Sequence, residues 1–157
     1  MLSPIFLSVA LQWKKSSPKL TGGYSSLLGF IKMIGNESVT QRINQIETIL
    51  LNYKFRFSCE NELQTGIENV LQISNIEYVR EKSISKRDRP DFIIDGIAVE
   101  IKIKGSLSTA IRQVARYASH DDIRAVLVIG TPFWILRIPK RLHEKEILSI
   151  RLIGSLL

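Results

Sequence analysis

The feature that most constrains this chain is an Asp-Gly pair, Asp95-Gly96, that lies between two apolar runs, residues 92–94 and 97–99. An Asp-Gly pair in this setting is a strong signal for a two-residue hairpin turn, because both central residues of that turn need positive φ. With this pair at the tip, Asp91 and Glu100 become opposite residues on neighbouring strands. The sequence therefore predicts a β-hairpin with two facing carboxylates.

Two facing carboxylates favour a cation between them. Directly opposed residues have Cβ atoms roughly 4.5–5.5 Å apart, so the two charges repel. Hard cations such as Mg²⁺ prefer oxygen ligands. Lys102 follows Glu100 by two residues and shares its face of the strand, where an ammonium can orient water or stabilise charge on a phosphate.

The alternative is an exposed hairpin whose acids point into water. The apolar residues of the hairpin argue against full exposure, and they are Phe92, Ile94, Ile97, Val99, Ile101 and Ile103.

The spacing of these residues resembles a known motif. Pro90-Asp91, an eight-residue spacer and Glu100-Ile101-Lys102 together resemble the PD-(D/E)xK nuclease superfamily. The predicted surroundings agree with it: a helix before the hairpin, a helix after it and then another strand. The resemblance covers roughly residues 58–130.

The resemblance implies roles for individual residues. Asp91 and Glu100 would be metal ligands, the backbone carbonyl of Ile101 a further ligand, and Lys102 the catalytic lysine. In many members a glutamate on the first helix completes the acidic cluster, and Glu60 best matches that position. The implied cofactor is Mg²⁺, with Mn²⁺ as a substitute.

The helix after the hairpin carries a second element of this kind. Gln113 and Tyr117 are four residues apart and hence neighbours on one side of a helix. They resemble the QxxxY element of RecB-like nucleases, whose cysteine cluster is absent here. We expect substrate contacts from these two residues and from four basic ones, which are Arg112, Arg116, Lys104 and Arg89.

Composition agrees with a polyanionic partner. The chain has 22 Lys+Arg against 15 Asp+Glu and a net charge of +7, which favours nucleic acid, here DNA. A single cysteine, Cys59, excludes an internal disulfide and suits a reducing, cytoplasmic location. No apolar run reaches the ~20 residues of a membrane span, so we expect no membrane partner.

Apolar spacing predicts the remaining elements. Helices are expected over residues 37–53, over 59–74 with Ser58 as N-cap, and after Gly105 with Ser106 or Ser108 as N-cap. Strands are expected over residues 76–84, 125–129 (buried on both faces) and 133–138 (an edge strand). Residues 142–157 are expected to hold a short helix and an apolar tail.

These elements predict an α/β fold. The expected architecture is a restriction-endonuclease-like core, a central mixed β-sheet flanked by helices on both faces in the order α-β-β-β-α-β. This core spans residues 58–140, between an N-terminal extension (1–57) and a C-terminal tail (141–157).

The predicted function is hydrolysis of DNA phosphodiester bonds by a magnesium-dependent nuclease. Two alternatives stay open on the same fold: a dimeric endonuclease similar to Holliday-junction resolvases, and a non-catalytic DNA-binding module. A homodimer is compatible with the size and basic charge of the chain.

Overall fold

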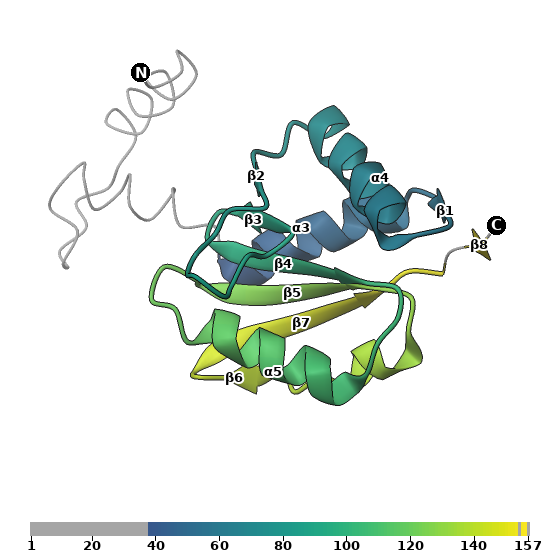
Figure 1. Cartoon of the computed structure of the whole chain (residues 1–157). Coiled ribbons are helices and arrows are strands. Elements are labelled where there is room, and N and C mark those ends of the chain that lie inside the picture. Colours follow the sequence, from purple (N-terminus) through teal and green to yellow (C-terminus); the bar gives the residue numbers. More distant parts are fainter. Residues whose placement is uncertain (1–37, 154, 157) are drawn as a thin grey trace, which may run out of the picture. The chain divides into compact units, whose positions relative to one another are not determined.

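The computed structural model describes residues 38–153 and 155–156 of the chain. They form an α/β fold with a six-stranded mixed β-sheet and helices on both of its faces (Figure 1). The strands of this sheet are β2 (Val79–Arg80), β3 (Phe92–Ile94), β4 (Ile97–Lys102), β5 (Ala125–Gly130), β6 (Arg141–Leu142) and β7 (Lys145–Arg151). Their order across the sheet is β2-β3-β4-β5-β7-β6, so the sheet is open, with β2 and β6 at its edges.

Three α-helices and one 3₁₀ helix accompany the sheet in the described residues. They are α3 (Val39–Leu51), α4 (Glu60–Ile73), α5 (Leu107–Ala118) and the 3₁₀ helix η1 (Phe133–Arg137). Two short strands, β1 (Arg56–Phe57) and β8 (Ser155–Leu156), form a separate parallel pair. Residues 1–37 of the predicted N-terminal extension lie outside the described residues.

The predicted hairpin is confirmed by strands β3 and β4. They pair antiparallel, with Ile94 opposite Ile97 and Phe92 opposite Val99. Asp95 and Gly96 have φ values of 49° and 77°, the positive values that a two-residue turn of this kind needs. From α4 to β5 the elements follow the predicted order of helix, three strands, helix and strand.

Strand alternation divides the core into two layers. Val99 and Ile101 of β4 pack in the layer that contains the apolar faces of α3 and α4. Ala98 packs in the other layer, with Val114 of α5 and Ile135 of η1. Strands β4, β5 and β7 are parallel to one another, and β5 is buried along its whole length, as predicted. Glu100 and Lys102 therefore share the α5 face of the sheet with Ala98.

The predicted N-cap of α4 is wrong by one residue. Cys59 occupies the cap position, while the Ser58 backbone N–H and hydroxyl donate to the Glu62 carboxylate (2.6 and 3.0 Å). These bonds lower the pKa of Glu62. Glu62 thus satisfies polar groups of Ser58, just before the helix. Glu60, in the same turn, contacts the backbone of Ile103 instead. The predicted strand over residues 76–84 is also shorter than expected, because only Val79–Arg80 pair with β3.

The sequence prediction fails after β5. Residues 133–138 were expected to form an edge strand, but Phe133–Arg137 form η1, which follows Pro132. Its backbone groups bond locally, as in the 3.1 Å bond from Ile135 N to Pro132 O, so this segment needs no partner strand.

The expected short helix and tail are wrong as well. Residues 145–151 form β7, an interior strand that pairs parallel with β5. A boundary at residue 140 therefore cuts through the sheet. A boundary at residue 57 separates α3 from α4, although both helices pack in one core layer. Ser38–Leu157 form one compact unit.

Gly130 allows β5 to pack closely against the end of β4. A Cβ atom at this position would lie 1.8 Å from the carbonyl oxygen of Lys102 and 2.8 Å from Cδ1 of Ile135. Gly66 in α4 is different, because its nearest neighbour is the ring of Phe55, at 3.1 Å. A methyl group is therefore excluded at Gly130 unless the backbone of β4 moves.

We expect Gly130→Ala to lower the free energy of unfolding by about 3 kcal/mol, the upper range for overpacking, as measured by chemical denaturation. Gly66→Ala is the matched control, since an aromatic side chain can yield where a backbone carbonyl cannot. Equal stability of Gly130→Ala and the natural protein would contradict this close packing.

Candidate functional site

Asp91 lies against the end of β4. The Ile101 backbone N–H donates to its Oδ2 (2.6 Å), and the Gln64 side-chain amide of α4 donates to its Oδ1 (2.8 Å). The Asp91 carbonyl accepts from the N–H of Glu81 (2.9 Å). The carboxylate is thus held from two elements, α4 and β4, at the point where β3 begins.

Glu100 is a buried carboxylate, 4% exposed, on the α5 face of β4. Its Oε1 accepts from the Gln113 side-chain amide (2.7 Å) and from the Lys102 ammonium. Its Oε2 accepts from the Tyr117 hydroxyl (2.9 Å). A charged group removed from water needs such donors, because an unpaired buried charge is very costly.

In the structure, Gln113 and Tyr117 of the QxxxY element form hydrogen bonds with Glu100. Gln113 and Tyr117 were predicted to contact substrate, but both donate to this carboxylate, and Gln113 also donates to the Tyr117 hydroxyl (2.7 Å). Tyr117 is 1% exposed. Burial and the Glu100 charge raise the pKa of Tyr117, so its hydroxyl stays protonated and donates. These residues hold Glu100 in place.

Glu60 reaches the same end of the sheet from the first turn of α4. Its Oε2 accepts from the backbone N–H of Ile103 (3.2 Å), just beyond β4. The side chains of Glu60, Asp91 and Glu100 therefore lie at the same end of β4, but within the described residues these three predicted ligands do not form a group that could hold a metal ion. Lys102 joins them through its ion pair with Glu100.

The pKa values of this cluster reflect its crowded negative charge. Burial and the charges of Glu100 and Glu60 raise the pKa of Asp91 to about 7, against the opposing effects of the Ile101 amide and Lys102. Burial by itself lowers the pKa of Lys102, but the carboxylates outweigh it and raise the pKa overall. Lys102 therefore stays an ammonium, and one positive charge faces three acidic side chains.

Two carboxylates, Asp91 and Glu100, are candidate ligands for a hard divalent cation. Asp91 accepts two hydrogen bonds within the described residues, and a carboxylate has about four lone-pair positions. Among residues 38–153, no group of three or more His, Cys, Asp or Glu side chains is arranged to hold a metal ion. Mg²⁺ is commonly bound by one or two carboxylates with several waters, which Asp91 and Glu100 can supply, with the Ile101 carbonyl nearby.

Asp88 is a buried acid that the sequence analysis did not single out. Its carboxylate accepts from Arg116 Nε (2.8 Å) and the Ser85 hydroxyl (2.9 Å), and it lies 3.0 Å from His120 Nε2. These contacts tie the basic segment 82–89 to α5. In the sequence, Asp88 is one acid within a run of basic residues, and nothing there indicates that it contacts Arg116 and His120.

The predicted DNA-contacting residues differ in their surroundings. Arg116 is paired with Asp88, so part of its role is structural. Arg89 is exposed and lies 3.6 Å from the carboxylate of Glu81. Lys104 and Arg112 are exposed at the surface, where Arg112 donates to the Thr109 hydroxyl (3.2 Å).

Gln64 is a site residue that sequence reasoning missed. It is one of several polar residues on α4, and nothing in the helical pattern distinguishes it from the others. Only its position over Asp91 does so.

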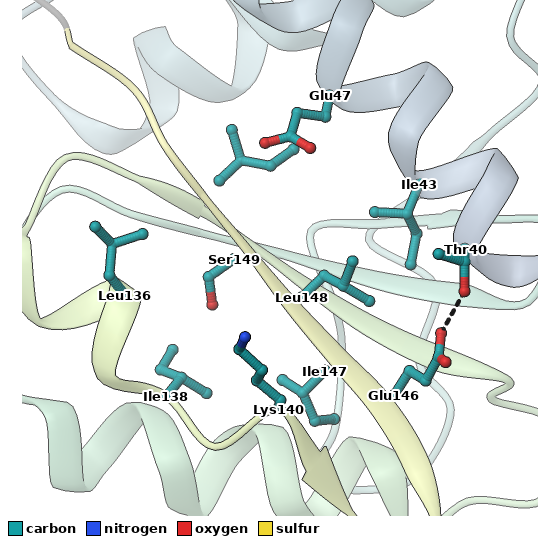
Figure 2. Close-up of a pocket in the computed structure, with 11 residues that line it drawn as sticks. Thr40, Ile43, Glu47, Leu136, Ile138, Lys140, Glu146, Ile147, Leu148 and Ser149 are labelled. Atoms are coloured by element: carbon teal, nitrogen blue, oxygen red, sulfur yellow. Dashed lines mark hydrogen bonds between the residues drawn. The ribbon is translucent and has the colours of Figure 1, made fainter.

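A separate cavity of about 380 Å³ lies along β7 (Figure 2). It is lined by α3, by η1 with the residues that follow it, and by β7. The Thr40 hydroxyl donates to Glu146 (2.8 Å) at its rim. None of the predicted site residues lines this cavity.

Comparisons of the chain with protein-family models, curated proteins and solved structures found no match. In the part of the chain that the structure describes, no helix has both the length and the apolar character needed to cross a membrane.

The Asp88 cluster predicts a pH dependence of stability. Burial by itself raises the pKa of Asp88, but hydrogen bonds from Arg116, His120 and Ser85 outweigh it and lower the pKa from 3.8 to about 2. The folded state therefore binds the proton less readily than the unfolded state. The resulting stabilisation is complete above about pH 4 and is lost as the pH falls toward about 2.

We expect Asp88→Asn to lower the melting temperature at pH 7, with a difference from the natural protein that shrinks between about pH 4 and 2. Thermal unfolding across this range measures the effect. Asp121→Asn, at an exposed acid after α5, is the control. A difference for Asp88→Asn that is constant with pH would rule out the charge as its cause.

Proposed function

We propose that this protein is a magnesium-dependent nuclease that hydrolyses phosphodiester bonds in DNA, with a site of the PD-(D/E)xK type on a restriction-endonuclease-like core. The observation that carries the proposal is the meeting of Asp91, Glu100 and Lys102 at one end of β4, with Glu60 beside them. These are the residues of the motif, held in one place by contacts from both faces of the sheet.

Asp91 and Glu100 would hold the cation, with the Ile101 carbonyl as a further oxygen donor and Glu60 beside them. A bound Mg²⁺ supplies Lewis-acid stabilisation of phosphoryl oxygens and lowers the pKa of water. The raised pKa of Asp91 supports this assignment, because crowded carboxylates are relieved by a cation.

Lys102 is the group that would act on the phosphate or on the attacking water. Glu100 holds its ammonium at the end of the strand, and one fifth of its side chain is exposed. A fixed ammonium beside the scissile phosphate stabilises the charge that develops in the transition state.

Gln113 and Tyr117 are positioning residues in this proposal. Their hydrogen bonds hold the Glu100 carboxylate, while Gln64 holds Asp91 in the same way from α4. Such contacts keep ligands in a productive orientation, as the outer-shell partners of metal sites generally do.

DNA is the proposed substrate because basic residues lie around the acidic site. Lys104, Arg112 and Arg89 are exposed, and the whole chain has a net charge of +7. Lysine and arginine bind the phosphate backbone without regard to sequence. We also propose a reducing, intracellular location, because the single cysteine, Cys59, is exposed.

The carboxylates provide the first test. We expect Asp91→Asn and Glu100→Gln to abolish cleavage of linear, circular, branched and single-stranded DNA in Mg²⁺, and to leave DNA binding unchanged or tighter, because negative charge leaves a phosphate-facing site. Asp121→Asn, at an exposed acid after α5, is the control and should cleave normally. Full activity of either site variant would refute the proposal.

Metal binding has a readout besides activity. Mg²⁺ should raise the melting temperature of the natural protein, since a ligand that binds only the folded state stabilises it. The increase should be lost in Asp91→Asn and kept in Asp121→Asn. If the natural protein binds DNA but its melting temperature does not change with Mg²⁺ or Mn²⁺, this result would favour the non-catalytic alternative.

The substitution Lys102→Met tests the role of the lysine independently of the metal ligands. The substitution keeps the bulk of the side chain and removes its charge, so turnover should fall by about 10²–10³-fold, as for other electrostatic stabilisers. The melting-temperature increase with Mg²⁺ should persist, because the carboxylates remain. Unchanged turnover would remove Lys102 from the reaction.

A further inference from the structure

An exposed aromatic side chain lies on the 3₁₀ helix that follows β5. Phe133, at the start of η1, is 76% exposed. The guanidinium of Arg151 lies over its ring, with its central carbon 3.7 Å from the ring centroid. The Nε of Arg151 donates to the carbonyl of Thr131 (3.1 Å), which fixes the cation over the ring.

Hydrogen bonds join this aromatic surface to the end of β4. The Thr131 backbone N–H donates to the Lys102 carbonyl (3.1 Å), and the Trp134 indole N–H donates to the Gly105 carbonyl (3.0 Å). The aromatic segment is therefore attached to the same stretch of chain that carries the catalytic lysine.

The sheet register gives the separation of the two features. Lys102 pairs with Gly130, and Gly130 pairs with Arg151, so the three residues form one row across β4, β5 and β7. Adjacent strands are about 4.8 Å apart, which puts the backbones of Lys102 and Arg151 roughly 10 Å apart. That separation corresponds to about three nucleotides stacked at 3.4 Å each.

An isolated exposed apolar residue is ordinary on protein surfaces. Phe133 differs because a cation is fixed against its ring, and because that cation, Arg151, lies in the same row of the sheet as Lys102. An aromatic ring with an adjacent arginine is the combination on which unpaired bases stack, while the arginine also attracts the phosphate backbone. Bases within an intact duplex are already stacked and reach such a ring only after costly flipping.

We propose that Phe133, with Arg151, forms a stacking platform for an unpaired base close to the scissile phosphate. This inference rests on the proposed nuclease function and specifies its substrate class. The preferred substrate is then single-stranded DNA, or a single-stranded segment of a larger DNA, and the platform holds a base within about three nucleotides of the bond that is cut.

Equilibrium binding without cleavage tests the platform. The full-length protein is titrated, in the presence of a chelator, with a fluorescent thymidine oligonucleotide of about 12 nucleotides, within the usual site size of single-strand binders, and with a duplex of equal length. The natural protein should bind the single strand more tightly. Phe133→Ala should weaken single-strand binding about tenfold and leave duplex binding almost unchanged.

Three further variants sharpen the comparison. Phe133→Trp keeps an aromatic face and should retain single-strand binding. Leu136→Ala, at an exposed aliphatic residue of the same 3₁₀ helix, should bind as the natural protein does. Thermal unfolding of each variant checks that η1 is intact, and Phe133→Leu repeats the test with apolar bulk retained.

The outcomes separate the platform from the nuclease. Unchanged single-strand affinity of Phe133→Ala, an equal loss for duplex, or no binding of single strands by the natural protein would overturn the platform. If the natural protein cleaves DNA in Mg²⁺ but Phe133→Ala binds single strands as tightly as it does, the nuclease function is supported and the platform is refuted. Loss of binding in Phe133→Ala with no cleavage under any metal would support the platform and refute the nuclease.

Discussion

The two-residue turn at Asp95-Gly96 is the constraint on which the site depends. It sets the register of β3 against β4, and that register decides which face of the sheet each side chain of β4 occupies. Side chains alternate with a period of two, so a slip of one residue would exchange Glu100 with its apolar neighbours. Glu100 would then lie under α3 and α4, away from the donors that α5 provides.

The site concentrates charge where the fold by itself would favour apolar residues. Burial of Glu100 is tolerated because Lys102, Gln113 and Tyr117 all donate to it. Asp91 is less well compensated, and its pKa rises to about 7 through burial and neighbouring negative charge. A raised pKa of this kind is typical of functional sites, where perturbed pKa values concentrate.

The contacts within the site show the limit of sequence reasoning. The motif predicted that Asp91, Glu100 and Lys102 would meet, because the turn and the alternation of a single hairpin are local. The partners of Gln113 and Tyr117 were not predicted, since their spacing shows only that they are neighbours on α5. Which carboxylate lies beneath them depends on how that helix crosses β4, and this is set by packing.

The sequence by itself determined the elements whose signals are local: the turn at Asp95-Gly96, the helices α3, α4 and α5, and the buried strand β5. Turn chemistry and apolar spacing act within a few residues, so they can be recognised along the chain. Only the tertiary structure decided that residues 145–151 form an interior strand and that residues 133–137 form η1. The first depends on the open edge of β5 as a pairing partner, and the second on backbone hydrogen bonds that close locally after Pro132.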